Sequence, residues 1–179
     1  MRCDIIIPVW NELETTRKCV DSLVKNTGYP FKLIVVDNAS DRETAFYLAA
    51  LKTRADISAD LIRNNENFGF AKAVNQGIAA SDAPYVCIMN NDTIVSAGWL
   101  EEMMNVMAAH SEIGILNPSS NTSGQGGPEK GSDPFSGPFC PDVLLDGFRM
   151  PITGCAAITF IISSSQPEAV IVSLFIMHR

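Results

Sequence analysis

The chain has 179 residues, of which 46% are hydrophobic and 18% are charged, and its formal net charge at pH 7 is −7. This composition is that of a globular protein with a buried core, so it excludes an intrinsically disordered chain. The acidic balance, without a long basic run, excludes a nucleic-acid-binding surface, and a bound phosphate group would need a local positive charge such as a metal ion.

The cysteines and the N-terminal segment indicate the compartment. Five cysteines are scattered along the chain without a C-x-x-C pair, which argues against a disulfide framework and against a zinc site. Asp4 and Pro8 interrupt the first apolar run, which therefore lacks the form of a signal peptide, and no run of about 18 apolar residues occurs. We therefore expect a cytoplasmic protein.

The N-terminal part of the chain predicts a strand, a helix and a second strand. Residues 4–9 are a β-branched apolar run with a proline near its end, which is typical of a buried central strand. A helix is expected over residues 14–26, with Gly28 as its stop and an inward face of Thr16, Cys19, Val20, Leu23 and Val24. Residues 31–36 are a second apolar run, and polar residues follow both strands.

A second helix is expected directly after this strand. Ser40 and Glu43 have the spacing of a capping box, which predicts a helix that starts near Asp41 and runs to about Leu51. In this interpretation Ser40 caps the helix, and Asp37 is left free to face a ligand.

The next segment combines a weak strand, a polar loop and a helix. Residues 60–63 predict the strand, and residues 64–69 predict the loop. The helix after it is expected to bury Phe70, Val74 and Ile78. Gly69 at its start would let a ligand approach the backbone, and Lys72 and Asn75 would share a face directed toward the same site.

Residues 85–89 are a short apolar run that ends in Asn90, Asn91 and Asp92. Its length suits a buried parallel strand, and open α/β sheets place their ligands at the carboxyl ends of such strands. One carboxylate there suits Mg²⁺, which takes one or two protein carboxylates and completes its shell with water and phosphate oxygens. The alternative is an Asx-rich turn with no ligand.

The remaining chain predicts one clear helix and several short segments. The helix covers residues 98–110, with Leu100, Met103, Met104 and Met107 facing the core and His110 at its C-terminal end. A strand is expected over residues 113–116, and a Gly/Pro/Ser-rich loop over 117–142 is either a lid or disordered. Further structure is expected over residues 143–145, one or two strands over 151–162, and a strand or helix over 170–177.

Alternating strands and helices predict a mostly parallel sheet whose strand ends deliver polar residues to one edge. An aromatic ring near Asp37 would hold a nucleobase, and Asp92 with a metal would hold a diphosphate. No G-x-G-x-x-G follows the first strand and no P-loop motif or G-x-S-x-G elbow occurs, which disfavours dinucleotide, P-loop and Ser-His-Asp chemistry. A nucleotidyltransferase would need a basic glycine-rich loop after the first strand, where residues 10–13 provide none.

Four motifs follow one another along the chain: residues 5–11 (IIIPVWN), 35–40 (VVDNAS), 64–77 (NNENFGFAKAVNQG) and 89–93 (MNNDT). Together they resemble the family 2 glycosyltransferases of the GT-A fold. The resemblance implies a Rossmann-like, mostly parallel sheet flanked by helices in three α/β/α layers. It also implies an inverting transferase of polysaccharide or cell-wall biosynthesis that uses a UDP- or dTDP-linked sugar, a saccharide or lipid-linked acceptor, and Mg²⁺ or Mn²⁺. Peripheral association with a membrane belongs to the same expectation.

The resemblance also implies roles for individual residues. Asp92 matches the metal-binding member of the family's D-x-D motif, and Asn90 replaces its first aspartate, as in rhamnosyltransferase-like members. The nucleotide sugar is expected to lie against Pro8, Trp10, Glu12, Asp37, Asn38, Asn67, Gly69, Lys72, Asn90 and Asn91.

The C-terminal third departs from the family pattern, which suggests a truncated or altered acceptor region. Residues 153–159 resemble the family's T-G segment, but the acidic motif expected after it is missing, and Glu168 is the one acidic residue beyond residue 162. Asp142 and Asp146 are then the remaining candidates for the catalytic base, which stays unassigned. We expect a single domain with a donor half (1–116), a flexible loop (117–142) and a partial acceptor side (143–179). The alternative function is a catalytically incompetent nucleotide-sugar-binding fragment.

Overall fold

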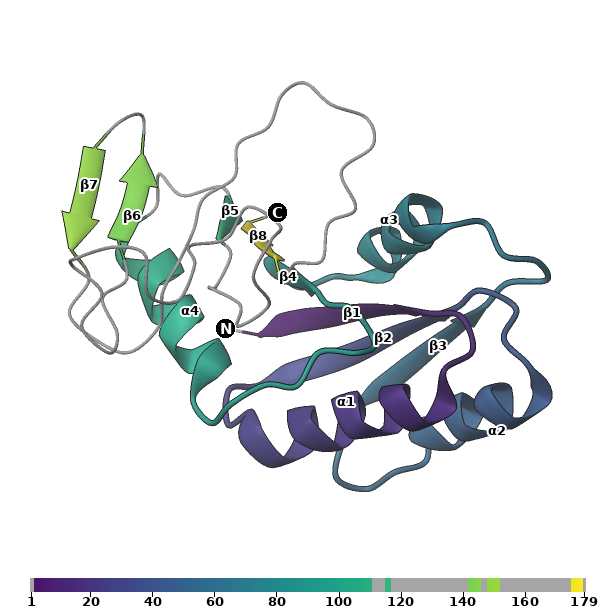
Figure 1. Ribbon diagram of the computed structural model, residues 1–179. Helices are drawn as coiled ribbons and strands as arrows, with labels where there is room; N and C mark the ends of the chain where they lie inside the picture. The colour runs from purple at the N-terminus through teal and green to yellow at the C-terminus, as the bar shows by residue number, and fades with distance from the viewer. Residues whose placement is uncertain (1, 111–114, 117–141, 146–147, 152–174, 179) are drawn as a thin grey trace, which may run out of the picture.

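The computed structural model describes residues 2–110, 115–116, 142–145, 148–151 and 175–178. Within these residues the main sheet has six strands, in the order β3-β2-β1-β4-β8-β5 (Figure 1). They are β1 (Cys3–Val9), β2 (Phe31–Asp37), β3 (Ala59–Arg63), β4 (Tyr85–Ile88), β5 (Ile115–Leu116) and β8 (Phe175–His178). A second sheet pairs β6 (Asp142–Leu145) with β7 (Phe148–Pro151). The helices are α1 (Leu13–Asn26), α2 (Arg42–Leu51), α3 (Phe70–Ala80) and α4 (Trp99–Ala109).

The order of the strands creates a switch point beside β1. The chain runs outward from β1 to β2 and β3, and then returns to place β4 on the other side of β1. These four strands are parallel, whereas β8 is antiparallel to both β4 and β5. In open α/β sheets, the carboxyl ends of the two strands at such a reversal border the usual ligand crevice. Here these strands are β1 and β4.

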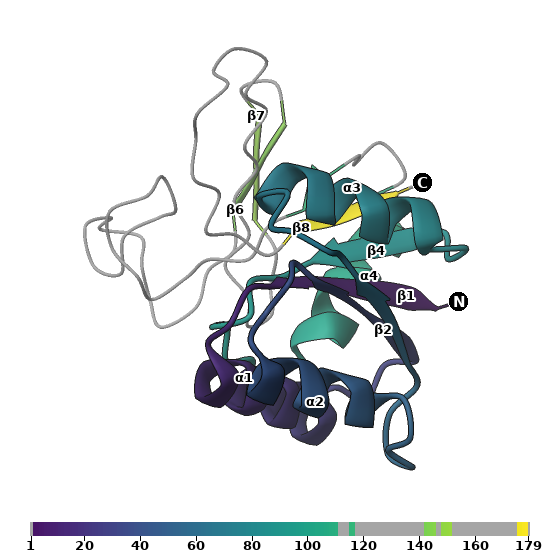
Figure 2. The same ribbon diagram turned by 90° about the vertical axis from the view of Figure 1, so that its right-hand side faces the viewer.

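Helices cover both faces of the sheet, which confirms the three-layer arrangement. Figure 2 shows α3 on one face and α1 and α2 on the other. The larger core cluster joins the sheet to α1, α2 and α4, and its members include Cys19, Leu48 and Met103. The smaller cluster consists of Ile6, Ile34, Val36, Ala73 and Val86, so α3 alone among the four helices contributes to it. β1 is therefore buried on both faces, as its continuous apolar run predicts.

Most of the predicted helix faces are confirmed. The inward residues expected for α1 and for α4 are buried, apart from Val24, which is partly buried against the same core. The prediction that Phe70 packs into the core is wrong, because its side chain is 44% exposed at the first position of α3. The helical spacing is kept by Val74 and Ile78, but α3 packs mainly through Ala73, Val74 and Gly77.

The later predictions are tested only in part. The expected strand over 113–116 is seen as β5 over its last two residues. β8 covers the last three residues of the predicted segment 170–177 and extends to His178, so the strand alternative is correct over residues 175–177. Asp142, placed in the loop by the sequence prediction, is the first residue of β6. Residues 117–141, 146–147 and 152–174 lie outside the described residues. None of the four helices seen in the described segments has the length and apolar character needed to cross a membrane.

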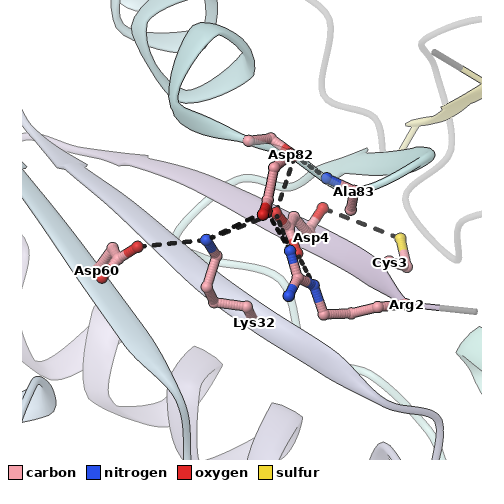
Figure 3. A network of polar contacts seen from close by, with 8 residues as sticks. Arg2, Cys3, Asp4, Lys32, Asp60, Asp82 and Ala83 are labelled. Atoms are coloured by element: carbon pink, nitrogen blue, oxygen red, sulfur yellow. Dashed lines mark hydrogen bonds and ion pairs between the residues drawn. The ribbon is translucent and has the colours of Figure 1, made fainter.

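A network of ion pairs and hydrogen bonds lies at the amino ends of the parallel strands (Figure 3). Asp4 is fully buried; its carboxylate accepts from Arg2 Nε and from Ser81 Oγ, each at 2.8 Å. Lys32 Nζ lies 3.9 Å from Asp4 Oδ2 and 3.3 Å from Asp60 Oδ2. The hydrogen bond from Arg2 lowers the pKa of Asp82. The charged groups at this edge are thus committed to one another, opposite the edge where a ligand is expected.

Candidate functional site

The candidate site lies at the carboxyl edge of the parallel strands, at the switch point between β1 and β4. Val9 at the end of β1 is in register with Asp37 at the end of β2, and Asp37 is in register with Arg63 at the end of β3. Met89 donates its backbone N–H to the carbonyl of Ile6, so the chain after β4 continues beside β1 toward Asn90, Asn91 and Asp92. The structure therefore brings the predicted polar segments to one edge.

Asp37 is held more tightly than the sequence predicted. Its side chain is fully buried; Oδ1 accepts from the backbone N–H of Ser40 at 2.8 Å, and Oδ2 pairs with Arg63 Nη1. The prediction of a free Asp37 carboxylate is therefore wrong. Arg63 also donates to the carbonyl of Ser40 at 3.0 Å, and its side chain is 45% exposed. An arginine thus faces solvent where only an acceptor was expected.

Ser40 does not cap α2, which corrects a second prediction. The N-cap is Asp41, whose carboxylate accepts from the backbone N–H of Thr44 at 2.8 Å, and this hydrogen bond lowers the pKa of Asp41. Ser40 Oγ instead accepts from the backbone N–H of Asn11 at 2.9 Å, and Asn11 Oδ1 accepts from the backbone N–H of Asp41 at 2.8 Å. The two hydrogen bonds tie the loops after β1 and β2 together.

The backbone of these loops includes three non-glycine residues in the left-handed region. Asn11 and Glu12 have φ of 59° each, and Ala39 has φ of 61°. Asparagine tolerates this region, whereas glutamate and alanine adopt it at a cost of order 1 kcal/mol, and such residues cluster at functional sites. Next to this turn, the Trp10 side chain is 57% exposed and is available for stacking.

The loop before α3 contributes open backbone at Gly69, and the first turn of α3 contributes one cation, Lys72. Asn67 Oδ1 accepts from the backbone N–H of Gly69 at 2.8 Å, and Gly69 has φ of 79°, which other residues rarely adopt. A Cβ on Gly69 would meet nothing within 4 Å, so this backbone is open to an approaching group. Lys72 Nζ lies 3.4 Å from the centroid of the Phe68 ring. The Lys72 and Asn75 side chains are both exposed.

The segment after β4 combines a turn with an available carboxylate. Thr93 donates its backbone N–H to the carbonyl of Asn90 at 3.3 Å, and Asn91 Nδ2 donates to Thr16 Oγ1 at 3.0 Å. Asn91 is thus anchored to α1. Asp92 is exposed, and across the described ranges its carboxylate makes no hydrogen bond or ion pair.

The residues at this edge suit a shared metal ion better than a resident one. In the described part of the chain, no group of three or more His, Cys, Asp or Glu residues is arranged to hold a metal ion. A lone carboxylate such as Asp92 is nevertheless sufficient for Mg²⁺ or Mn²⁺ when a substrate supplies phosphate oxygens.

Cys19 lies against the segment that follows β4 but does not fit a nucleophile. Its Sγ lies 3.6 Å from the carbonyl oxygen of Asn90 and 3.9 Å from Met89 Sδ. Burial, together with the charge of Asp92, raises the pKa of the Cys19 thiol to about 12, so the thiol stays protonated at neutral pH. The raised pKa therefore disfavours a thiolate nucleophile at this position.

Comparison with known proteins identifies the family. Residues 4–162 match the family model for glycosyl transferase family 2. The chain belongs to glycosyl transferase family 2. Glycosyltransferase AglE of Haloferax volcanii is 30% identical over 107 residues, which are 58% of this chain and 34% of AglE. An N-acetylglucosaminyltransferase of Azorhizobium caulinodans is 25% identical over 117 residues, or 64% of this chain and 30% of the relative.

Two solved structures confirm the mostly parallel, Rossmann-like α/β fold. S. aureus TarS 1-349 in complex with UDP-GlcNAc has a TM-score of 0.62 and 21% identity, covering 73% of this chain and 38% of TarS 1-349. Mannosyltransferase PcManGT of Pyrobaculum calidifontis, in complex with GDP-Man and Mn²⁺, has a TM-score of 0.58 and 24% identity, covering 63% and 34%. The chain spans about a third of the length of the curated relatives described above.

The sequence interpretation missed two features of this edge of the sheet. Arg63 was unassigned, although a cation at the end of the strand next to the Asp37 strand was a usable signal. The hydrogen bonds of Asn64 Nδ2 to Asn38 Oδ1 and to Gln76 Oε1 were missed because these partners are distant in sequence. Asp142 begins β6, and Asp146 lies outside the described residues, so neither candidate base is placed at the site.

Proposed function

We propose that the chain carries the donor site of an inverting glycosyltransferase, which moves a sugar from a nucleotide-diphosphate sugar to a saccharide or lipid-linked acceptor. The observation that carries the proposal is the exposed Asp92 carboxylate, which follows β4 at the switch point and has no partner within the described segments. Residues 1–116 form the donor half in this proposal, and residues 143–179 contribute to the acceptor side. We assign the activity to the cytoplasm, with peripheral membrane contact for a lipid-linked acceptor.

In this proposal, different residues at the edge of the sheet bind different parts of the donor. The exposed ring of Trp10 stacks on the base, and the Asp37–Arg63 pair lies where the polar edge of that base would be read. The open backbone at Gly69 and the ammonium of Lys72 serve the phosphate region. The remaining contacts of this proposed site come from Pro8, Glu12, Asn38, Asn67, Asn90 and Asn91.

The proposed reaction is a single displacement at the anomeric carbon. The acceptor hydroxyl oxygen attacks this carbon from the face opposite the diphosphate, and the bond between the carbon and the diphosphate oxygen breaks with its electron pair on the diphosphate. A base takes the hydroxyl proton; Asp142 and Asp146 remain the candidates for it. Mg²⁺ or Mn²⁺ held by Asp92 would supply positive charge to the departing diphosphate.

The ligands of two structural neighbours support a nucleotide-sugar donor and a divalent metal ion in this proposal. TarS has been solved with UDP-GlcNAc, and PcManGT with GDP-Man and Mn²⁺. For this chain we propose a UDP- or dTDP-linked donor and include GDP among the probes.

Calorimetric titration tests the donor site. UDP, dTDP and GDP are each titrated into the wild-type chain with Mn²⁺ and with EDTA, and then into Asp92→Ala and Asp92→Asn. We expect one nucleotide to bind with Mn²⁺, and both substitutions to weaken this binding at least tenfold, because neither replaces the carboxylate charge. Equal binding by wild type and both variants would remove Asp92 from the metal site.

A nucleotide-sugar-binding role without transfer is the second candidate function. It is favoured by the composition of residues 163–179. They contain one acidic residue, Glu168, and therefore lack the acidic motif that the family resemblance predicts there. Metal-dependent release of free sugar from UDP-GlcNAc by wild type, at a rate above that of Asp92→Ala, would count against this candidate.

A further inference from the structure

A network of three side-chain amides, from Asn38, Asn64 and Gln76, lies beside the candidate site, and two of its members, Asn64 and Gln76, have no role among those proposed above. Asn64 Nδ2 donates to Asn38 Oδ1 at 2.8 Å and to Gln76 Oε1 at 2.9 Å. Gln76 Nε2 donates back to Asn64 Oδ1 at 2.9 Å. Asn38 Nδ2 then donates to the carbonyl of Gly69 at 3.2 Å. The chain of hydrogen bonds therefore runs from the second turn of α3, through the ends of β3 and β2, back to the start of α3.

One end of this network is rigid. Asn38 and Asn64 are 4% and 7% exposed, and each follows directly after a strand of the sheet. Their backbones are fixed as well, because Asn38 donates its N–H to the carbonyl of Val9 and Asn64 donates its N–H to the carbonyl of Asp37, both at 2.8 Å. The positions of the two amides are thus set by β1, β2 and β3.

The other end is an exposed turn with little else to hold it. Residues 65–67 and 69–72 are exposed, and α3 has no side-chain cap at Gly69. Within the described part of the chain, the bond from Asn38 to the carbonyl of Gly69 is the hydrogen bond that joins residues 65–72 to the neighbouring strand ends.

The network also determines which way each amide faces. The carbonyl of Gly69 can only accept, so it directs Asn38 Nδ2 toward itself and Asn38 Oδ1 toward Asn64. Asn64 Nδ2 then donates to Asn38, and Gln76 holds the Asn64 amide in this orientation through two further hydrogen bonds. Removal of Gln76 would take these two bonds from Asn64 and so weaken its support of Asn38 and of the contact with Gly69.

We propose that Asn64 and Gln76 are positioning residues that act through Asn38 to hold the turn at Gly69 beside the ends of β2 and β3. The consequence for a ligand rests on the proposed donor site, since this turn places Gly69 and Lys72. Neither Asn64 nor Gln76 touches the donor. They keep the turn in its binding geometry before the nucleotide arrives, which lowers the cost of ordering it on binding.

Local hydrogen exchange and nucleotide binding test the proposal together. Gln76→Leu removes the amide at similar size, Gln76→Met is the second variant should the first not fold, and Asn64→Ala removes the central member. The control is Thr27→Val, which removes the acceptor of the 2.8 Å bond from Trp99 Nε1 at the opposite end of α1. Exchange is followed in peptides covering residues 67–73 and, for comparison, residues 3–9 of β1.

We expect exchange over 67–73 to become about tenfold faster in Gln76→Leu with β1 unchanged, and to stay at the wild-type rate in Thr27→Val. The Kd of the nucleotide that binds wild type with Mn²⁺ should rise about tenfold. Because Gln76 acts through Asn64, the Gln76→Leu substitution should add nothing further in an Asn64→Ala background.

Unchanged exchange over 67–73 overturns the proposal whether or not any nucleotide binds. Faster exchange with an unchanged Kd overturns the role in the donor site. Absence of binding by the wild type to UDP, dTDP and GDP instead contradicts the proposed function, and the exchange result then decides the fate of the positioning role by itself.

Discussion

The contact between Gly77 and Ile6 gives the most direct prediction about packing. A Cβ on Gly77 would lie 2.4 Å from Ile6 Cγ2 and 3.3 Å from Ile6 Cγ1, and Ile6 is fully buried in β1. Carbon atoms in contact are ordinarily separated by about 3.5–4.0 Å. In Gly77→Ala, α3 must therefore move away from the sheet or Ile6 must leave its preferred rotamer.

Two opposing effects set the size of the change. Overpacking of a core costs about 1–3 kcal/mol. Alanine in place of glycine inside a helix contributes about 1 kcal/mol in the stabilising direction. Because 2.4 Å is far inside contact distance, we expect overpacking to win and the free energy of unfolding to fall by about 1 kcal/mol.

Urea denaturation of the full chain measures this change. Asn75 is exposed in the same helix, so the difference between Asn75→Ala and Asn75→Gly gives the helix-propensity effect without the clash. Ile6→Ala removes the side chain that is struck, and its combination with Gly77→Ala should therefore cost less than the sum of the two single changes. A Gly77→Ala variant that gains stability by the full Asn75 difference would refute the close approach of α3 to β1.

Three further predictions concern the site and its surroundings. Arg63→Met leaves the buried Asp37 without its cation and should lower the free energy of unfolding by about 2 kcal/mol. The loss is smaller than for a fully buried ion pair because Arg63 is 45% exposed, and an unchanged midpoint of urea denaturation would contradict the prediction. Because the pKa of Cys19 is raised to about 12, Cys19 of the native protein should be alkylated at pH 8 far more slowly than Cys19 of the urea-unfolded protein, as mass spectrometry of the labelled peptide would reveal. The free energy of unfolding should also decline above about pH 9, because the thiol of the unfolded chain ionises first. The pKa of Asp41 is lowered by the N–H of Thr44, so the stability difference between wild type and Asp41→Ala should be full at pH 7 and shrink as pH falls below about 4; a constant difference in thermal melts would exclude this cap.

The parts of the fold that local pattern determines were predictable. Residues 4–9, 31–36 and 85–89 are apolar runs of strand length, and a strand that is buried on both faces admits few other sequences. The inward faces of α1 and α4 follow from helical spacing alone. The polar residues after each strand reach one edge because parallel strands share a direction.

The errors arose where a local rule competed with tertiary contacts. Ser40 has the residue type and spacing of a cap, but Asp41 performs this role while Ser40 accepts from Asn11, a residue distant in sequence. Phe70 has core spacing but occupies the first position of α3, before the helix reaches the sheet. The pairing of Asp37 with Arg63 depends on strand register, which the sequence does not state.

The position of β8 affects how the sheet can be assembled during synthesis. The parallel strands β1 to β4 come from one continuous stretch, residues 3–88, and can pair as soon as that stretch has left the ribosome. β8 is made much later, yet it lies between β4 and β5 and pairs with both. Until Phe175–His178 emerges, β4 presents an open edge to solvent and to other nascent chains. Pairing of β8 with β4 must also bring together two segments that are far apart in the sequence, which has a high entropic cost. Pauses in translation between β4 and β8 would prolong the exposure of this edge. Synonymous codons that speed translation of residues 89–178 are therefore expected to raise the soluble yield.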